Sequence, residues 1–203
     1  MNSRTKKLVY LGLLLGIEAV FCFTPLGSLP ALGPIVMTLA MIPVIITGQL
    51  LGKNYGALMG LAAGLFSLIV WTFFPANPLL AFLFSPFYTL GKYQGNFGSL
   101  LICFIPRILT GYFAGLFSEI FNKKRPNKTF MNNMWAAIIG SLTNTFGVLG
   151  LAGVFFAAQY SDIASGAFLI LALGTILTNG VPEAILAGLV CPNIVKALNK
   201  TIK

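Results

Sequence analysis

Long apolar stretches alternate with short polar connections along the whole chain. A helix needs about 20 apolar residues to cross a bilayer. Stretches near this length fall at residues 8–24, 33–52, 54–74, 99–121, 134–158 and 164–190. The pattern therefore predicts an all-α integral membrane protein, a bundle of six transmembrane helices. We expect residues 1–203 to form a single transmembrane domain.

The distribution of charge predicts how these helices are oriented. Charged residues make up 8% of the chain and the net charge is +9, whereas soluble domains carry about 25% charged residues. Eleven of the thirteen lysines and arginines fall before the first stretch, after the second, between the fourth and fifth, or in the tail. Six spans place these connections on one side, and the positive-inside rule assigns that side, with both termini, to the cytoplasm. The basic run at 123–128 is thus interpreted as a topology signal, compatible with anionic lipid, and not as a nucleic-acid site.

The connection at residues 75–98 lies on the outer side in this topology and is long for a simple turn. Long connections are usually functional lids or disordered segments. Its aromatic residues favour a packed cap over the outer face. They are Phe82, Phe84, Phe87, Tyr88 and Tyr93. A second outer loop, at residues 25–30, is short and rich in glycine and proline.

One arginine interrupts an uncharged apolar stretch. Arg107 falls roughly a dozen ångströms below the outer face, at about 1.5 Å of helix per residue. A charge at that depth is costly unless it is paired or hydrated, and such residues usually mark a ligand or ion site. Pro106, just before it, frees a backbone carbonyl in the preceding turn. The alternative is a snorkelling or structurally paired arginine, with Glu18, at a comparable depth, as the competing ion-pair partner.

Further polar side chains lie within the last two predicted spans. Asn144 and Thr145 fall in the fifth, and Asn179 falls in the sixth. Asparagine in hydrocarbon needs hydrogen-bond partners, which either another helix or a ligand can supply. Their presence together with Arg107 favours a polar pocket that binds a ligand.

Several kinds of chemistry lack their residues in this sequence. There is no histidine, no G-x-x-x-x-G-K-[ST] loop and no G-x-S-x-G elbow, so neither ATP hydrolysis of that type nor a hydrolase is predicted. The three cysteines have no CxxC spacing, so we expect no metal site, no thiol-redox centre and no cofactor. Four carboxylates make a poor proton relay. The expectation is a non-catalytic membrane protein with a pocket, whose energy source lies outside the chain.

Glycines recur at four-residue spacing in two of the predicted helices. They are Gly12 and Gly16 in the first, and Gly56, Gly60 and Gly64 in the third. Such spacing lets helix backbones approach closely in lipid. For the third helix we favour packing inside the bundle. For the first helix, which is short and terminal, packing inside the bundle and contact with a partner protein both fit.

Several segments resemble the substrate-binding S components of bacterial energy-coupling factor (ECF) vitamin transporters. The resemblance rests on GPIVMTLAMIPVIITG at 33–48, LLGKNYGA at 50–57 and GLAAGLFS at 60–67. IPRILTG at 105–111 and SLTNT at 141–145 resemble the pantothenate-type branch. The resemblance implies a component of the bacterial plasma membrane that captures a vitamin from outside. It would dock through its first span on a transmembrane coupling subunit carried by two ATP-binding subunits, with Gly12 and Gly16 in place of the usual alanines.

The polar residues and the resemblance agree on a ligand that bears a carboxylate. Arg107, with Lys92 in the lid, would suit the carboxylate, because arginine binds carboxylates in bidentate geometry. Asn144, Thr145 and Asn179 would suit amide and hydroxyl groups, and the apolar walls would be Trp71, Phe73 and Tyr88. Pantothenate fits this inventory best, while Trp71 leaves folate, riboflavin or a pyrimidine- or pyridoxine-like ring open. An autonomous ion-coupled carrier and a purely structural assembly subunit are the other function classes.

Overall fold

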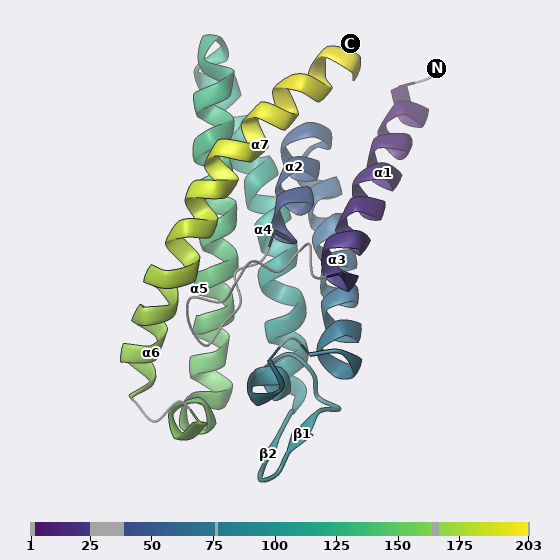
Figure 1. Ribbon diagram of the computed structural model, residues 1–203. Helices are drawn as coiled ribbons and strands as arrows, with labels where there is room; N and C mark the ends of the chain where they lie inside the picture. The colour runs from purple at the N-terminus through teal and green to yellow at the C-terminus, as the bar shows by residue number, and fades with distance from the viewer. Residues whose placement is uncertain (1–2, 25–38, 76, 164–166, 203) are drawn as a thin grey trace.

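Helices form most of the structure (Figure 1). The computed structural model of the chain describes residues 3–24, 39–75, 77–163 and 167–202, so the predicted loop at 25–30 and the first part of the predicted second span lie outside the described residues. The helices are α1 (Ser3–Phe23), α2 (Met41–Leu51), α3 (Lys53–Phe73), α4 (Phe97–Lys124), α5 (Thr129–Ile163), α6 (Phe168–Thr175) and α7 (Val181–Ile202). The shorter elements are the 3₁₀ turns η2 (Pro78–Leu83) and η3 (Pro126–Lys128), the π-helical turn η4 (Ile176–Gly180), and the strands β1 (Thr89–Leu90) and β2 (Tyr93–Gln94).

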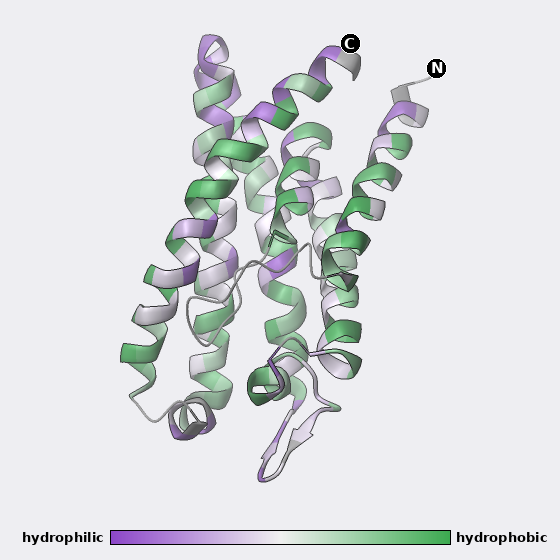
Figure 2. Ribbon diagram, viewed as in Figure 1, coloured by the Kyte–Doolittle hydropathy of each residue, from purple (hydrophilic) through white to green (hydrophobic). Residues whose placement is uncertain are grey.

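Four of the described helical segments are long and apolar enough to cross a membrane. They are Lys53–Phe73, Phe97–Lys124, Pro126–Gln159 and Phe168–Lys200. The bundle is hydrophobic along most of its length, and hydrophilic residues gather at the ends of the helices and in the hairpin (Figure 2). The described chain thus confirms an all-helical membrane architecture apart from one short hairpin, while six spans stay a prediction. α2 is a shorter apolar helix of 11 residues.

Several helices extend past the limits that hydropathy predicts. The fifth predicted span, 134–158, is the middle of the 35-residue helix α5. The sixth, 164–190, continues through α7 to Ile202. Apolar stretches report the part of a helix that hydrocarbon can surround, whereas backbone hydrogen bonding continues into the polar ends. Near its end α5 bends at Phe156, whose φ of −139° and ψ of 18° are not helical.

Residues 77–96 form a folded cap at one end of the bundle. Phe82 and Phe84 are 0% and 4% exposed. The Phe82 ring stacks on Tyr93, with centroids 5.8 Å apart, and meets the edge of Phe156 at 5.5 Å. The predicted packed cap is confirmed for these residues, whereas Phe87 is 76% exposed.

A two-stranded antiparallel hairpin in the cap is the part of the fold that an all-α prediction omits. Leu90 pairs with Tyr93, and Gly91 in the turn between them has a φ of +58°. Glycine adopts this conformation without strain, and two-residue hairpin turns require it. At the other side of the cap, the Ser99 hydroxyl in the first turn of α4 donates to the Phe82 carbonyl at 2.6 Å. The cap is therefore joined directly to the start of α4.

The centre of the bundle is a close seam between α3 and α4, which α2 also joins. A methyl group built on Gly60 would overlap the backbone carbonyl of Arg107, and one built on Gly56 would overlap that of Gly111. Gly48 of α2 meets the same Gly111 carbonyl. The contacts confirm that the glycines of the third predicted helix serve packing inside the bundle.

Four parts of the chain lie together at one end of the bundle (Figure 1). They are the first turn of α1, the α2–α3 junction, the α4–α5 connection and the last turn of α7. The cap lies at the opposite end. The described parts of the cation-rich connections therefore share one end of the bundle.

Candidate functional site

Arg107 lies inside the bundle, on α4, with 7% of its surface exposed. Pro106 has no backbone N–H, so the carbonyl four residues earlier, that of Ile102, has no helical donor. The Arg107 Nη1 donates to this carbonyl at 2.6 Å. The freed carbonyl that the sequence predicts is therefore satisfied by the neighbouring arginine, which fixes the direction of the guanidinium.

The rest of the guanidinium faces a polar hydroxyl and an aromatic stack. Nη2 is 3.4 Å from the Ser67 hydroxyl of α3, and the guanidinium carbon lies 5.2 Å from the centre of the Phe84 ring. Phe84 in turn stacks on Trp71 at 4.6 Å and 26°. Trp71, predicted as a wall, thus stands behind Phe84 in the same stack. The sequence reasoning did not select Ser67 or Phe84 as site residues, because these contacts join positions 40 and 23 residues from Arg107.

The ion pair that competes with a ligand for Arg107 is not formed. Glu18 is 0% exposed, and its carboxylate accepts from the Cys22 thiol at 3.4 Å. No salt bridge joins Glu18 to Arg107 in the described part of the chain, although the two groups are near enough to interact electrostatically. Arg107 therefore keeps a charge that no carboxylate contacts directly, and its Nε has no partner among the described residues.

Asn144 lies on the face of α5 that packs against the Arg107 turn of α4. Gly140 meets the Thr110 carbonyl, and Gly147 meets the Pro106 ring. Asn144 falls four residues after the first glycine and three before the second, which places it on the same face. Its Oδ1 is buried and has no partner within the described residues.

Asn179 lies in the π-helical turn η4, between α6 and α7. Such turns are rare and occur frequently at functional sites. Asn179 is 3% exposed, and its Nδ2 donates to the Thr178 hydroxyl at 2.9 Å, while its Oδ1 has no described partner. The predicted site residue Thr145, 8% exposed, contacts Gly180 across the α5–η4 interface, so Thr145 and Asn179 belong to one region.

The remaining predicted site residues lie in or beside the cap. Lys92 Nζ is 2.6 Å from Asp162 Oδ2 at the end of α5, and the Tyr93 hydroxyl donates to the same carboxylate. Hydrogen bonding to Asp162 raises the pKa of Lys92, and hydrogen bonding from Lys92 lowers the pKa of Asp162. Lys92 therefore contacts Asp162 and Tyr93 and not Arg107. Tyr88 is half-buried at the base of the hairpin, and Phe73, which is 69% exposed, lies outside the buried cluster.

Some buried polar atoms of the interior have no hydrogen-bond partner among the described residues. In the described part of the chain these side-chain atoms belong to Glu18, Gln49, Arg107, Asn144 and Asn179. A buried polar atom without a partner is costly, and each one in a native structure requires an explanation. Arg107 offers an N–H donor and a positive charge, and the two asparagines offer carbonyl oxygens. The set is suited to a small molecule with a carboxylate and with hydroxyl or amide donors.

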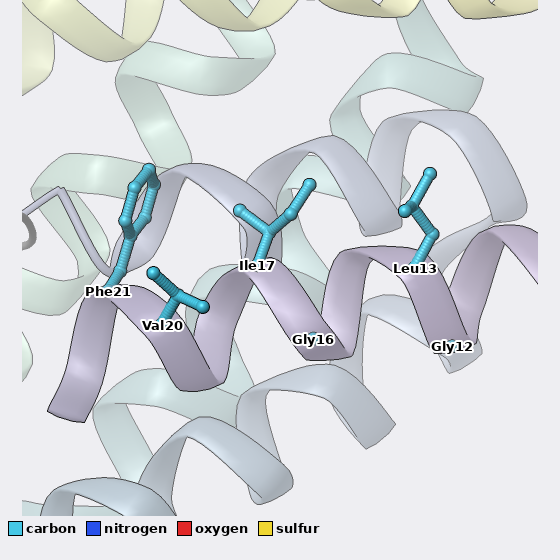
Figure 3. A pocket seen from close by; sticks show the side chains of 6 residues that line it. All are labelled: Gly12, Leu13, Gly16, Ile17, Val20 and Phe21. Atoms are coloured by element: carbon cyan, nitrogen blue, oxygen red, sulfur yellow. The ribbon is translucent and has the colours of Figure 1, made fainter. Parts of the chain in front are cut away.

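A shallow apolar groove runs along the outer side of α1 (Figure 3). Leu13, Ile17 and Phe21 form a ridge at four-residue spacing, and Gly12 and Gly16 lie beside it. Both glycines are exposed, and a methyl group on either would meet nothing within 4 Å among the described atoms. These glycines therefore do not pack inside the described bundle.

Comparison with known proteins agrees with this architecture. Residues 6–195 match the family described as ECF transporter, substrate-specific component. The chain is 36% identical over 169 residues to the pantothenic acid transporter PanT of Lactococcus lactis subsp. cremoris (strain MG1363), covering 82% of this chain and 80% of that protein.

Solved structures show the same fold at low sequence identity. ThiT from Listeria monocytogenes aligns with a TM-score of 0.62 at 15% identity over 99% of each chain. The S-component for biotin from an ECF-type ABC transporter aligns with a TM-score of 0.51 at 17% identity, over 97% of this chain and 95% of that one. The protein is a non-catalytic, multi-pass component of the bacterial plasma membrane. The chain belongs to the substrate-specific components of ECF transporters.

Proposed function

We propose that this chain captures pantothenate at the outer face of the membrane for an ATP-driven importer. The observation that carries the proposal is the buried Arg107 guanidinium, which no carboxylate contacts and whose Nε lacks a described partner. The 36% identity to a pantothenic acid transporter supports the choice of vitamin. Pantothenate has one carboxylate, one amide and two hydroxyls, which match the groups that the interior offers.

Each of the predicted site residues has a role in this proposal. Arg107 binds the vitamin carboxylate through Nε and the free edge of Nη2, since Nη1 is held by Ile102. The Asn144 and Asn179 oxygens accept from hydroxyl or amide donors, with Thr145 beside them. Trp71 supports the Phe84 wall, and Tyr88 and Lys92 belong to the cap that closes the outer end.

The same proposal includes orientation and assembly. The chain is a single domain of six spans with both termini in the cytoplasm, because the cation-rich connections share the end opposite the cap. The exposed Gly12 and Gly16 groove of α1 docks on the transmembrane coupling subunit, which two ATP-binding subunits drive. Lipid surrounds the remaining apolar faces.

Calorimetric titration of the purified, detergent-solubilised chain tests the proposal directly. We expect tight binding of pantothenate and none of folate, riboflavin or pyridoxine. Selective binding of another vitamin would replace the substrate, and absence of binding to folded protein would overturn the capture role. In liposomes the chain alone should give no sustained uptake, and uptake that an ionophore collapses would instead identify an autonomous carrier.

A further inference from the structure

One side chain of the cap reaches the Arg107 guanidinium. Phe84 is 4% exposed, and its ring lies over the guanidinium, with 5.2 Å between the guanidinium carbon and the ring centre. A cation within about 6 Å of a ring centre is attracted to the ring face, more strongly where both groups are shielded from water. Nη1 is held by the Ile102 carbonyl, and Nη2 lies 3.4 Å from the Ser67 hydroxyl. The guanidinium therefore has contacts at two nitrogens and on one face, and the edge at Nε stays open among the described residues.

The cap segment that carries Phe84 is tied to the bundle on both sides of the ring. Before it, the Phe82 carbonyl accepts from the Ser99 hydroxyl of α4 at 2.6 Å. After it, Ser85 is 0% exposed, and its hydroxyl is hydrogen bonded to the Thr72 hydroxyl of α3 at 2.7 Å. Buried hydrogen bonds of this kind fix the local backbone, because breaking one leaves an unsatisfied polar group. The Phe84 ring is thus held from its own backbone.

The ring is also supported from α3. Trp71 stacks on the face region of Phe84 with ring centres 4.6 Å apart. Ser67, which contacts Nη2, precedes Trp71 by four residues, so the two side chains lie on the same face of the helix. One face of α3 therefore contributes both a polar contact to the guanidinium and the support of the ring that covers it.

These contacts decide how far the guanidinium can turn. A carboxylate binds a guanidinium in the plane of its N–H groups, so the direction of that plane determines whether a bidentate contact forms. The short hydrogen bond from Nη1 to Ile102 fixes one point of the group, and the plane can still turn about it. An aromatic ring over the face opposes this rotation. The open Nε edge then points in one direction.

We propose that Phe84 is a positioning residue, which holds the guanidinium plane of Arg107 so that its Nε edge faces the carboxylate of the bound vitamin. The inference rests on the proposed function. The cap thereby contributes to recognition of the carboxylate without touching it. This contribution is confined to ligands that carry the anionic group, whereas simple closure of the site by the cap would affect every ligand alike.

Titration calorimetry of Phe84→Leu with two ligands separates these roles. Leucine keeps an apolar side chain and removes the ring, and panthenol has an alcohol in place of the carboxylate of pantothenate. We expect the preference for the carboxylate, the Kd of panthenol divided by that of pantothenate, to fall about 5- to 30-fold. Phe84→Tyr keeps the ring and should keep the preference.

The matched control is Phe82→Leu, which removes another buried ring from the same cap. Phe82 contacts Tyr93 and Phe156, and no contact joins it to Arg107 among the described residues. Its replacement should weaken the cap and lower the affinity for both ligands in the same proportion. The preference for the carboxylate should therefore stay at the wild-type value.

Nitrogen-15 NMR of arginine-labelled protein measures the positioning without a ligand. The chain has three arginines, and the Arg107 signals are those missing from Arg107→Ala. We expect separate Nη1 and Nη2 signals in the wild type, because a held guanidinium turns slowly about its Nε–Cζ bond, and averaging of the two in Phe84→Leu. Trp71→Leu leaves the ring but removes its support, so it should cause a smaller change of the same kind. This variant also tests the stack if Phe84→Leu does not fold.

The outcomes distinguish the inference from the function on which it rests. Equal loss of affinity for both ligands in folded Phe84→Leu, a similar change of preference in Phe82→Leu, or unchanged Arg107 signals would each overturn the positioning role. All three would leave the capture function standing. Absence of pantothenate binding to the folded wild-type chain would overturn the proposed function and the inference with it.

Discussion

The glycines of α1 and α3 share one spacing and have opposite surroundings. Both helices are 21 residues long. In α3, methyl groups on Gly56 and Gly60 would overlap backbone carbonyls of α4. In α1, methyl groups on Gly12 and Gly16 would meet nothing within 4 Å among the described atoms. The pattern of small residues shows that close approach is possible, but only the fold shows whether the approaching helix belongs to the same chain.

The two helices therefore differ in what their glycines contact. The closed seam fixes α4 against α3, and Gly60 contacts the backbone of the residue, Arg107, whose side chain enters the proposed site. The open groove of α1 has no contact of this kind among the described residues, and in the proposed function it docks on the coupling subunit. Changes in the seam should therefore affect the isolated protein strongly, and changes in the groove should affect it little.

The strongest expected effect on the isolated protein comes from Gly60→Leu. Added side-chain volume would separate α3 from α4, and overpacking of this kind costs about 3 kcal/mol or more where backbone must move. We expect loss of monodisperse, folded protein in size-exclusion chromatography and a large drop in thermal stability in detergent. Gly150→Leu is the matched control, because Gly150 is exposed and has open space at its Cβ position. Equal stability of the two variants would show that the seam is not tight.

Arg107→Ala should have the next largest effect and tests the side chain that the seam positions. Loss of one partner of a buried charged contact typically costs 2–5 kcal/mol, or about 30- to 5,000-fold in Kd. The Ile102 carbonyl also loses its donor, so a smaller loss of stability, about 1–3 kcal/mol, should accompany it. Titration calorimetry and thermal unfolding separate the two effects. Wild-type affinity in folded Arg107→Ala would exclude the carboxylate role.

Lys92→Gln should have a smaller effect, confined to the cap. The side chain of Lys92 is 71% exposed and that of Asp162 is 53% exposed, so solvent and salt screen the ion pair between them. Because the pKa of Asp162 is lowered, the ion pair contributes to the stability of the cap at neutral pH. This contribution is lost as the pH falls through the pKa of Asp162. The raised pKa of Lys92 extends the contact to alkaline pH, where it is lost as Lys92 deprotonates.

Hydrogen exchange of the hairpin amides measures this effect. We expect modestly faster exchange in Lys92→Gln and in Asp162→Asn, and convergence of wild type and variants at high salt. Lys128→Gln, a change of another exposed lysine at the opposite end of the bundle, is the control. Faster exchange in that control as well would show that net charge, and not the Asp162 contact, controls the hairpin.

Local features of this fold were predictable from sequence, and long-range ones were not. Hydropathy locates the long helices, and Pro106 predicts a free carbonyl in the turn before Arg107, because both depend on adjacent residues. The Ser67 and Phe84 contacts of Arg107 join separate elements, so no local pattern indicates them. The absence of a direct Glu18–Arg107 salt bridge has the same origin, since equal depth in a membrane does not determine which faces of two helices meet.

The smallest effect on the isolated protein, and the sharpest test of the comparison, belongs to Gly16→Leu. Because the position is exposed and open, the added side chain should change stability and vitamin affinity by no more than about 0.5 kcal/mol. In the assembled importer the same side chain would fill the groove beside Ile17, so co-purification with the coupling subunit and vitamin uptake in proteoliposomes should both be lost. Leu58→Ala, at an exposed position on α3, is the control and should keep both. Normal assembly and uptake in Gly16→Leu would mean that the groove of α1 faces lipid alone. Without a closely packed partner, the groove would then need no glycine at position 12 or position 16.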